Sequence, residues 1–250
     1  MTTRPRRIAG LLYALAAHLA ATTSFAYLLG FLLGARVPRT VDRGGPSAPF
    51  WGALAVDALL LAAFAVPHSV LARPWWKRRW RRVVPAALER STYGLVAAAS
   101  MALLFWQWRP IPALVWDARG AAAVALRGAF WAGWAVAAVS VVTTNLFDLT
   151  GLRQALAAAR GRVAAPQPLT RRGLYAHARH PLYVGFFLAL WGAPAMSAGR
   201  LLFAAACTAY VLVAVRYEER DLAAEHGPAY EAYRAEVARF GWPRARRPGG

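Results

Sequence analysis

Residues 181–215, PLYVGFFLALWGAPAMSAGRLLFAAACTAYVLVAV, decide the fold, because they form a long apolar stretch that is interrupted near its middle. Gly192, Pro194 and Gly199 fall at the interruption and divide the stretch into two arms. At 1.5 Å per residue, each arm as a helix crosses about 20–25 Å. The pattern predicts a helical hairpin of two short spans that packs against other helices.

Further apolar stretches precede this hairpin, and loops that contain glycine and proline separate them. They cover residues 8–34, 51–71, 93–108 and 124–147. With 58% hydrophobic and 16% charged residues, a soluble domain of 250 residues cannot bury all these stretches, and disorder is excluded. We expect an all-α, polytopic integral membrane bundle of about six transmembrane segments. The hairpin supplies the last two, and a charged C-terminal helix follows.

The net charge of +19, from 30 Lys and Arg against 11 Asp and Glu, raises the possibility of nucleic-acid binding. The distribution of the basic residues along the chain gives a different explanation of this charge. With a cytoplasmic amino terminus and six crossings, 23 of the 30 basic residues lie in cytoplasmic segments. This asymmetry follows the positive-inside rule. It predicts both termini in the cytoplasm and no nucleic-acid partner, and we expect the membrane to be a bacterial inner (plasma) membrane. We expect residues 1–147 to form the first four spans with their loops, and residues 148–250 to form a second region, which would bind a ligand and consists of the inner loop, the hairpin and the C-terminal helix.

The sequence GLYAHARHPLYVG, residues 173–185, lies where a polar loop enters the hairpin. Pro181 is suited to the first turn of a helix, where the backbone N–H groups have no intrahelical partner. We expect these donors, with Arg179 and His180, to form an electropositive pocket for a carboxylate or another anion. The alternative is an ordinary helix start at the membrane interface.

Acidic residues follow the hairpin directly, within residues 216–240. Glu218 and Glu219 point about 100° apart on a helix, so they do not form a matched acid–base pair. One of them can face inward to meet a cationic ligand while the other pairs with Arg216 or Arg220. The alternative is a solvated helix that carries ion pairs.

Tyr230 and Tyr233 are three residues apart and therefore share one face of a helix. Polar residues within the spans are also informative, because they are costly in a bilayer and usually face the protein interior. We expect His18 and Asp57 to be packing residues. His68 lies near the cytoplasmic end of its span, where it either accepts a proton or orients a small substrate, or is a packing residue itself.

Metal chemistry is not expected. His177 and His180 are three residues apart, but no further ligand set accompanies them. The one cysteine, Cys207, excludes an internal disulfide and a multi-cysteine metal site.

In combination, these motifs resemble the membrane methyltransferases, a group that includes isoprenylcysteine carboxyl methyltransferases and phospholipid methyltransferases. The shared pattern consists of RHPLYVG (179–185), the hairpin, EERDL (218–222) and Tyr230, Tyr233 and Arg234. The amino-terminal part resembles the methanethiol S-methyltransferase family more narrowly. The matching segments are PHSVLARPW (67–75), ERSTY (89–93), FWQWRPIP (105–112) and FDLTGLRQ (147–154).

The resemblance implies an enzyme that uses S-adenosyl-L-methionine to methylate methanethiol, a small thiol, to dimethyl sulfide. It implies cofactor contacts from Arg179, His180, Pro181, Tyr183, Gly185, Glu218, Glu219, Tyr230 and Tyr233. His68 or Arg234 is the expected catalytic residue that promotes loss of the thiol proton, because the thiolate is the nucleophile. A small apolar thiol can reach such a site through the lipid bilayer.

Other classes of protein remain open on the sequence. One is a methyltransferase that acts on a prenylcysteine carboxylate or a lipid headgroup. Another is a non-enzymatic membrane protein of the denitrification-associated kind. The sequence leaves the oligomeric state and the proton acceptor undetermined. The methyltransferase interpretation requires His180 and Glu219 to lie close together.

Overall fold

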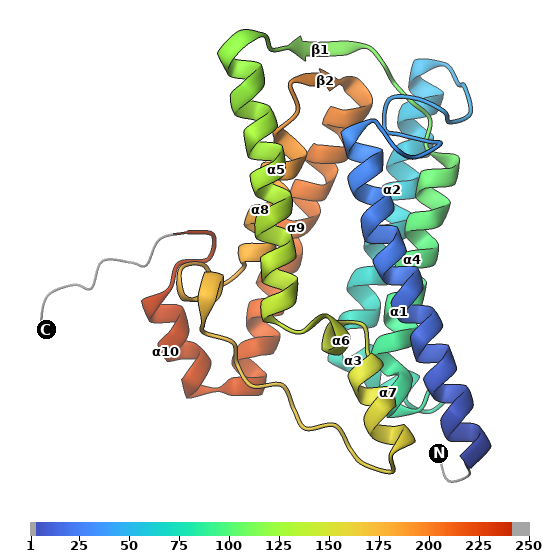
Figure 1. The fold of residues 1–250 in the computed structure, drawn as a ribbon, viewed down its shortest axis with the longest axis vertical. Helices are drawn as coiled ribbons and strands as arrows, with labels where there is room; N and C mark the ends of the chain where they lie inside the picture. Colours follow the sequence, from blue (N-terminus) through green and yellow to red (C-terminus); the bar gives the residue numbers. More distant parts are fainter. Residues whose placement is uncertain (1–3, 242–250) are drawn as a thin grey trace, which may run out of the picture. The chain divides into compact units, whose positions relative to one another are not determined.

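The structure, a computed structural model, describes residues 4–241, and these residues are mainly helical (Figure 1). Within them, four helices are long and apolar enough to cross a membrane: α1 (Arg4–Leu33), α2 (Phe50–Ala72), α5 (Gly120–Thr143) and α9 (Ala198–His226). Two further helices belong to the predicted spans: α4 (Glu89–Gln107) and α8 (Pro181–Trp191). The expected all-α polytopic membrane fold is confirmed.

Short elements connect these helices. They are α3 (Pro74–Trp80), η1 (Ala86–Leu88), β1 (Leu114–Asp117), α6 (Leu146–Leu149), α7 (Leu152–Ala159), η2 (Gly173–Ala176), β2 (Ala195–Ser197) and α10 (Pro228–Glu236). Strands β1 and β2 pair to form a small two-stranded sheet.

The two arms of the hairpin are unequal in length, which differs from the expectation of two short spans. Helix α8 has 11 residues and is about 16 Å long, whereas α9 has 29 residues and is about 43 Å long. Residues 201–226 contain no glycine or proline, so the apolar helix continues through the charged run. Helix α9 ends before Gly227, which has a positive φ of 52°, and Pro228 starts α10. Glu218 and Glu219 therefore lie on the spanning helix itself.

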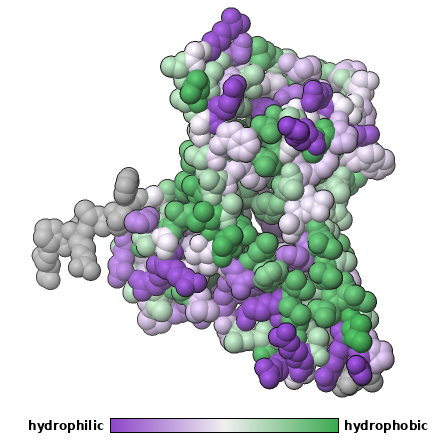
Figure 2. Space-filling model, in the orientation of Figure 1, coloured by the Kyte–Doolittle hydropathy of each residue, from purple (hydrophilic) through white to green (hydrophobic). Residues whose placement is uncertain are grey.

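Large apolar side chains are exposed along the long helices, as expected for surfaces that face lipid. Leu12, Leu59, Val124 and Val142 are examples of these exposed side chains. Figure 2 shows hydrophobic residues over the middle of the helices and hydrophilic residues toward their ends. The lipid bilayer is the solvent that makes such a surface stable.

The chain folds into two compact units that do not follow sequence order. The first contains the described residues up to Leu114, with Leu146–Pro166 and Ser197–Phe203. The second contains Val115–Asn145, Gln167–Met196 and the described residues from Ala204 onward.

In the first unit, α4 packs on α1 and α2, and α7 packs on α1. Two polar residues within the spans of this unit, Asp57 and His18, have partners. The buried Asp57 carboxylate accepts a hydrogen bond from the Arg109 N–H at 2.8 Å, and His18 Nδ1 lies 2.8 Å from Thr150 Oγ1. Both side chains have the contacts expected of packing residues.

In the second unit, α5 and α8 cross with their backbones in direct contact. A Cβ atom added to Gly133 would lie 2.5 Å from the Gly185 carbonyl oxygen, and one added to Gly185 would lie 2.7 Å from the Ala137 nitrogen. Small residues at such crossings are typical of membrane helices, whose association depends on close packing. Gly185 therefore has a packing function, whatever its relation to a cofactor.

Candidate active site

The motif RHPLYVG begins α8 as the sequence predicts, with His180 before the helix and Pro181 as its first residue. Its backbone donors, however, are not free for an anion. The Arg179 N–H donates to the Ala238 carbonyl at 3.0 Å, and the His180 N–H donates to the Arg239 carbonyl at 3.1 Å. Within the first turn, the Tyr183 N–H donates to the His180 carbonyl at 3.1 Å. The expectation of free donors is therefore wrong for Arg179 and His180, which pair with residues after α10, and for Tyr183, which pairs within the turn.

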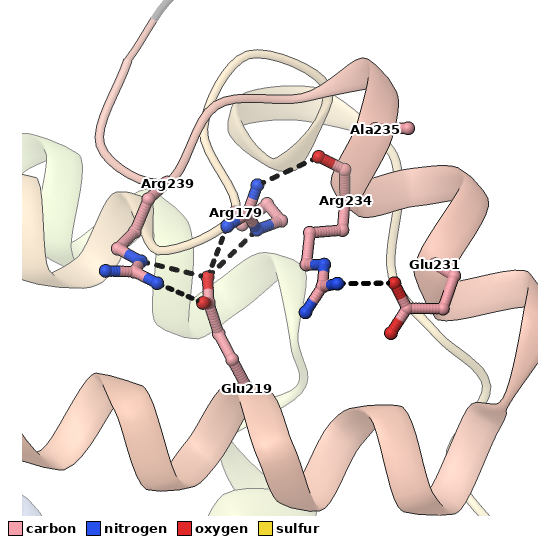
Figure 3. A pocket seen from close by; sticks show the side chains of 6 residues that line it. All are labelled: Arg179, Glu219, Glu231, Arg234, Ala235 and Arg239. Carbon is pink, nitrogen blue, oxygen red and sulfur yellow. Dashed lines mark hydrogen bonds and ion pairs between the residues drawn. The ribbon is translucent and has the colours of Figure 1, made fainter.

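The carboxylate of Glu219 is the centre of a buried charged cluster (Figure 3). Arg179 donates to its Oε1 atom through Nε at 3.0 Å and Nη2 at 2.5 Å. Arg239 donates through Nε to Oε1 at 3.2 Å and through Nη2 to Oε2 at 2.5 Å. His180 Nε2 lies 3.3 Å from Oε1. The requirement that His180 and Glu219 lie close together is met.

The neighbouring carboxylate, Glu218, has a different environment. It accepts a hydrogen bond from the Tyr183 hydroxyl at 2.8 Å, and His180 Nδ1 lies 3.8 Å away. Its side chain is 43% exposed, whereas that of Glu219 is 6% exposed. The expected difference in direction between the two residues is confirmed. The partner of Glu218 is Tyr183 rather than Arg216 or Arg220.

Tyr230 and Tyr233 form one buried aromatic pair, with ring centroids 6.2 Å apart. They pack with Val237, and the Tyr233 hydroxyl donates to the Tyr175 carbonyl at 2.5 Å. Burial raises the pKa of Tyr233 to about 12, so its hydroxyl stays protonated as a donor. The pair thus anchors α10. Its contact with a cofactor remains a prediction.

A cavity of about 440 Å³ opens beside the charged cluster. It is lined by Arg179, Glu219, Glu231, Arg234, Ala235 and Arg239 (Figure 3). This volume lies within the usual range for small-molecule sites, about 300–1,000 Å³. Guanidinium groups in such a cavity can bind a carboxylate, and carboxylates can bind a cation.

The predicted catalytic residue Arg234 lies at this cavity. Its Nη2 atom is 2.8 Å from the Glu231 carboxylate, and both side chains are about half exposed. Because an arginine does not lose its proton in proteins, Arg234 can stabilise an anion but cannot act as a base.

His68 belongs to the first unit, on α2. Its Nε2 atom lies 2.8 Å from the Tyr93 hydroxyl, and its ring stacks on Phe64 with centroids 4.9 Å apart. The environment is well packed, and the catalytic function of His68 remains a prediction.

Arg239, Glu231, Ala235 and Phe240 contribute to this region but were not predicted from the sequence. Arg239 is one of several basic residues in the carboxy-terminal tail, so its residue type did not distinguish it as a site residue. Contact with Glu219 also raises the pKa of Arg239, which is a direct consequence of the ion pair. Glu231 and Ala235 lie on α10, and the return of the chain after α10 brings Arg239 and Phe240 to the start of α8.

The fold and site define a helical integral membrane protein whose carboxy-terminal half holds a cavity between arginine and glutamate side chains. The chain belongs to the methanethiol S-methyltransferase family. It is 49% identical to Methanethiol S-methyltransferase 2 of Bradyrhizobium diazoefficiens over 231 residues, which are 92% of this chain and 89% of the relative. It is 45% identical to Methanethiol S-methyltransferase of Mycobacterium tuberculosis, over 95% of this chain and 98% of the relative.

A more distant similarity connects the chain with a Nurim homolog of Drosophila pseudoobscura pseudoobscura. The identity is 31% over 69% of this chain and 71% of the relative. No family model matches the chain, and no solved structure matches it.

Proposed function

We propose that this protein transfers a methyl group from S-adenosyl-L-methionine to methanethiol and so forms dimethyl sulfide. The names of the relatives supply the reaction. The observation that carries the proposal is the buried contact between Arg179 and Glu219, which lies beside a cavity of about 440 Å³. Motifs from two distant parts of the chain meet there.

The chemistry of the lining residues fits S-adenosyl-L-methionine, which has a carboxylate, an ammonium group and a sulfonium. When bound, this compound supplies an electrophilic methyl group on its cationic sulfur. Arg234, half exposed at the cavity, is proposed to bind the carboxylate. Glu218, which is next in sequence to the lining residue Glu219 and has a side chain 43% exposed, is proposed to contact the cationic part of the donor.

The thiol must lose its proton before it can attack the methyl carbon. The new carbon–sulfur bond forms as the bond from the sulfonium breaks, and the proton goes to a base or to water. Charge is dispersed in this step, so positioning and exclusion of water contribute more than covalent participation of the protein. His68 is the proposed proton acceptor, and Arg234 is proposed to stabilise an anionic group.

We also propose that residues 216–241 and the amino-terminal end of α1 lie in the cytoplasm of a bacterial inner membrane. The support is the distribution of the basic residues, with 23 of 30 on that side. Reporter fusions after residue 241 should be fluorescent with a cytoplasmic reporter and inactive with a periplasmic phosphatase. The opposite pattern would reverse the orientation.

The activity is tested by headspace gas chromatography of membranes that contain the protein. Membranes given methanethiol and S-adenosyl-L-methionine should release dimethyl sulfide, whereas membranes that carry Arg179→Gln should release little. The same membranes are given a prenylcysteine and a phospholipid acceptor in parallel. Methylation of either acceptor in place of methanethiol would overturn the proposed substrate, and absence of any methylated product would overturn the proposed activity.

A further inference from the structure

Residues 237–240, which follow α10, lie along the start of α8. The carbonyls of Ala238 and Arg239 accept hydrogen bonds from the N–H groups of Arg179 and His180, at 3.0 and 3.1 Å. The ring of Phe240 lies 6.3 Å from the ring of His180, measured between centroids. This stretch thus covers the backbone donors of the RHP motif.

The Arg239 side chain adds a charged contact to this backbone pairing. Its guanidinium holds the Glu219 carboxylate through two nitrogens, at 3.2 and 2.5 Å. The Arg239 side chain is 40% exposed, whereas that of Glu219 is 6% exposed, and both residues line the cavity (Figure 3). Arg239 therefore lies at the rim of the cavity while its partner lies in the interior.

Through Glu219, one carboxylate connects three separate stretches of chain. Arg179 precedes α8, Glu219 lies on α9, and Arg239 follows α10. Arg179 also donates to the carbonyl of Val237 at 2.5 Å and to that of Arg234 at 3.2 Å. Residues 237–240 are not helical. Holding each of them in one conformation costs conformational entropy, which contacts with the rest of the protein must offset. Bidentate, charge-assisted contacts are the strongest hydrogen bonds available for this purpose.

We propose that Arg239 is a positioning residue for the methyl donor. Its ion pair with Glu219 holds residues 237–240 against the start of α8 and keeps this side of the donor cavity in place. The inference rests on the proposed function, with S-adenosyl-L-methionine as the donor. Arg239 acts on the cavity wall and not on the transferred methyl group. Its loss therefore weakens donor binding and leaves the chemical step intact once donor is saturating.

Calorimetry on the full chain in lipid nanodiscs tests this proposal. Arg239→Gln should weaken binding of S-adenosyl-L-methionine about tenfold, the scale of one lost charge-assisted contact, and should raise its KM equally. The kcat and the KM for methanethiol should stay near their wild-type values. Arg239→Lys keeps the charge and should restore part of the affinity. Arg119→Gln, which removes the exposed ion pair with Asp117, is the matched control and should change nothing.

Two further measurements separate positioning from a general structural role. Hydrogen exchange of peptides that contain Arg179 and His180 should be faster in Arg239→Gln, because the pairing with residues 238 and 239 is loosened. In a Glu219→Gln background, Arg239→Gln should have a much smaller additional effect on donor affinity, since the two residues act as one unit. Unfolding temperatures of all variants establish that they are folded.

Unchanged or tighter donor binding in Arg239→Gln would overturn the proposal, and tighter binding would identify Arg239 as a competitor of the donor cation. In either case the proposed function stands if the wild-type protein binds the donor and forms dimethyl sulfide. A wild-type protein that binds no S-adenosyl-L-methionine would overturn both. If Arg239→Gln does not fold, Arg239→Lys decides. The proposal then expects weaker donor binding and faster exchange in Arg239→Lys, and wild-type donor affinity with unchanged exchange would overturn it.

Discussion

Arg179 and Glu219 are 40 residues apart in the sequence and form a buried ion pair, with Nη2 and Oε1 2.5 Å apart. Arg179 lies two residues before the start of α8, and Glu219 lies near the carboxy-terminal end of α9. Their side chains are 7% and 6% exposed. The pair therefore closes the α8–α9 hairpin on the side that carries the candidate donor cavity.

Glu219→Gln should destabilise the protein strongly, because it leaves the Arg179 guanidinium buried without its counter-ion. Breaking a buried pair from one side costs about 3–5 kcal/mol. Thermal unfolding of the purified protein in detergent should show a clear decrease in Tm. Glu236→Gln removes the exposed ion pair with Arg171 and should cost about 0–1 kcal/mol. Equal decreases in the two variants would contradict the importance assigned to the buried pair.

Glu218→Gln should affect donor binding more than folding. The side chain is 43% exposed and accepts a hydrogen bond from the Tyr183 hydroxyl, and we propose that it contacts the donor cation. We expect donor affinity to fall about tenfold, which is the scale of one ion pair in a partly shielded site, with little change in Tm. Tyr183→Phe, which removes only the hydroxyl, should have a smaller effect. A large loss of Tm with unchanged donor affinity would show that Glu218 is structural.

Gly133→Ala should disrupt the crossing of α5 and α8. The added methyl group would lie 2.5 Å from the Gly185 carbonyl oxygen and from the Ala189 nitrogen, both of which are backbone atoms. Overpacking of this kind typically costs about 1–3 kcal/mol. Gly128→Ala on the same helix meets nothing within 4 Å and is the matched control. If both substitutions lower the unfolding temperature equally, the close crossing does not contribute to stability.

His68→Ala tests the proposed proton acceptor. If His68 accepts the thiol proton, turnover should fall most at low pH, where little thiolate forms spontaneously, and donor affinity should be unchanged. The measurement is the pH profile of dimethyl sulfide formation at saturating donor. Tyr93→Phe, which removes the hydroxyl 2.8 Å from Nε2, should change the same profile in a smaller degree. Wild-type turnover of His68→Ala at every pH would remove this residue from the mechanism.

Local sequence features predicted much of this protein. Apolar stretches of membrane-spanning length predicted the helices, because a bilayer requires about 20 apolar residues for each crossing. Pro181 predicted the start of α8, since its fixed φ suits a first helical turn. The 100° step between successive residues predicted that Glu218 and Glu219 face different surroundings. Each of these features depends on neighbouring residues alone.

The tertiary structure decided which distant residues meet. The packing of Gly133 on Gly185 and the pairing of residues 238 and 239 with the RHP backbone depend on how the chain returns on itself. Arg239 is one of 30 basic residues, and nothing in its type or spacing distinguishes it from the others. Local periodicity determines helices and their faces, whereas contacts between distant segments depend on the packing of the whole chain. For that reason the sequence identified Arg179, His180 and Glu219, and only the three-dimensional structure identified the residue that holds Glu219 from the other side.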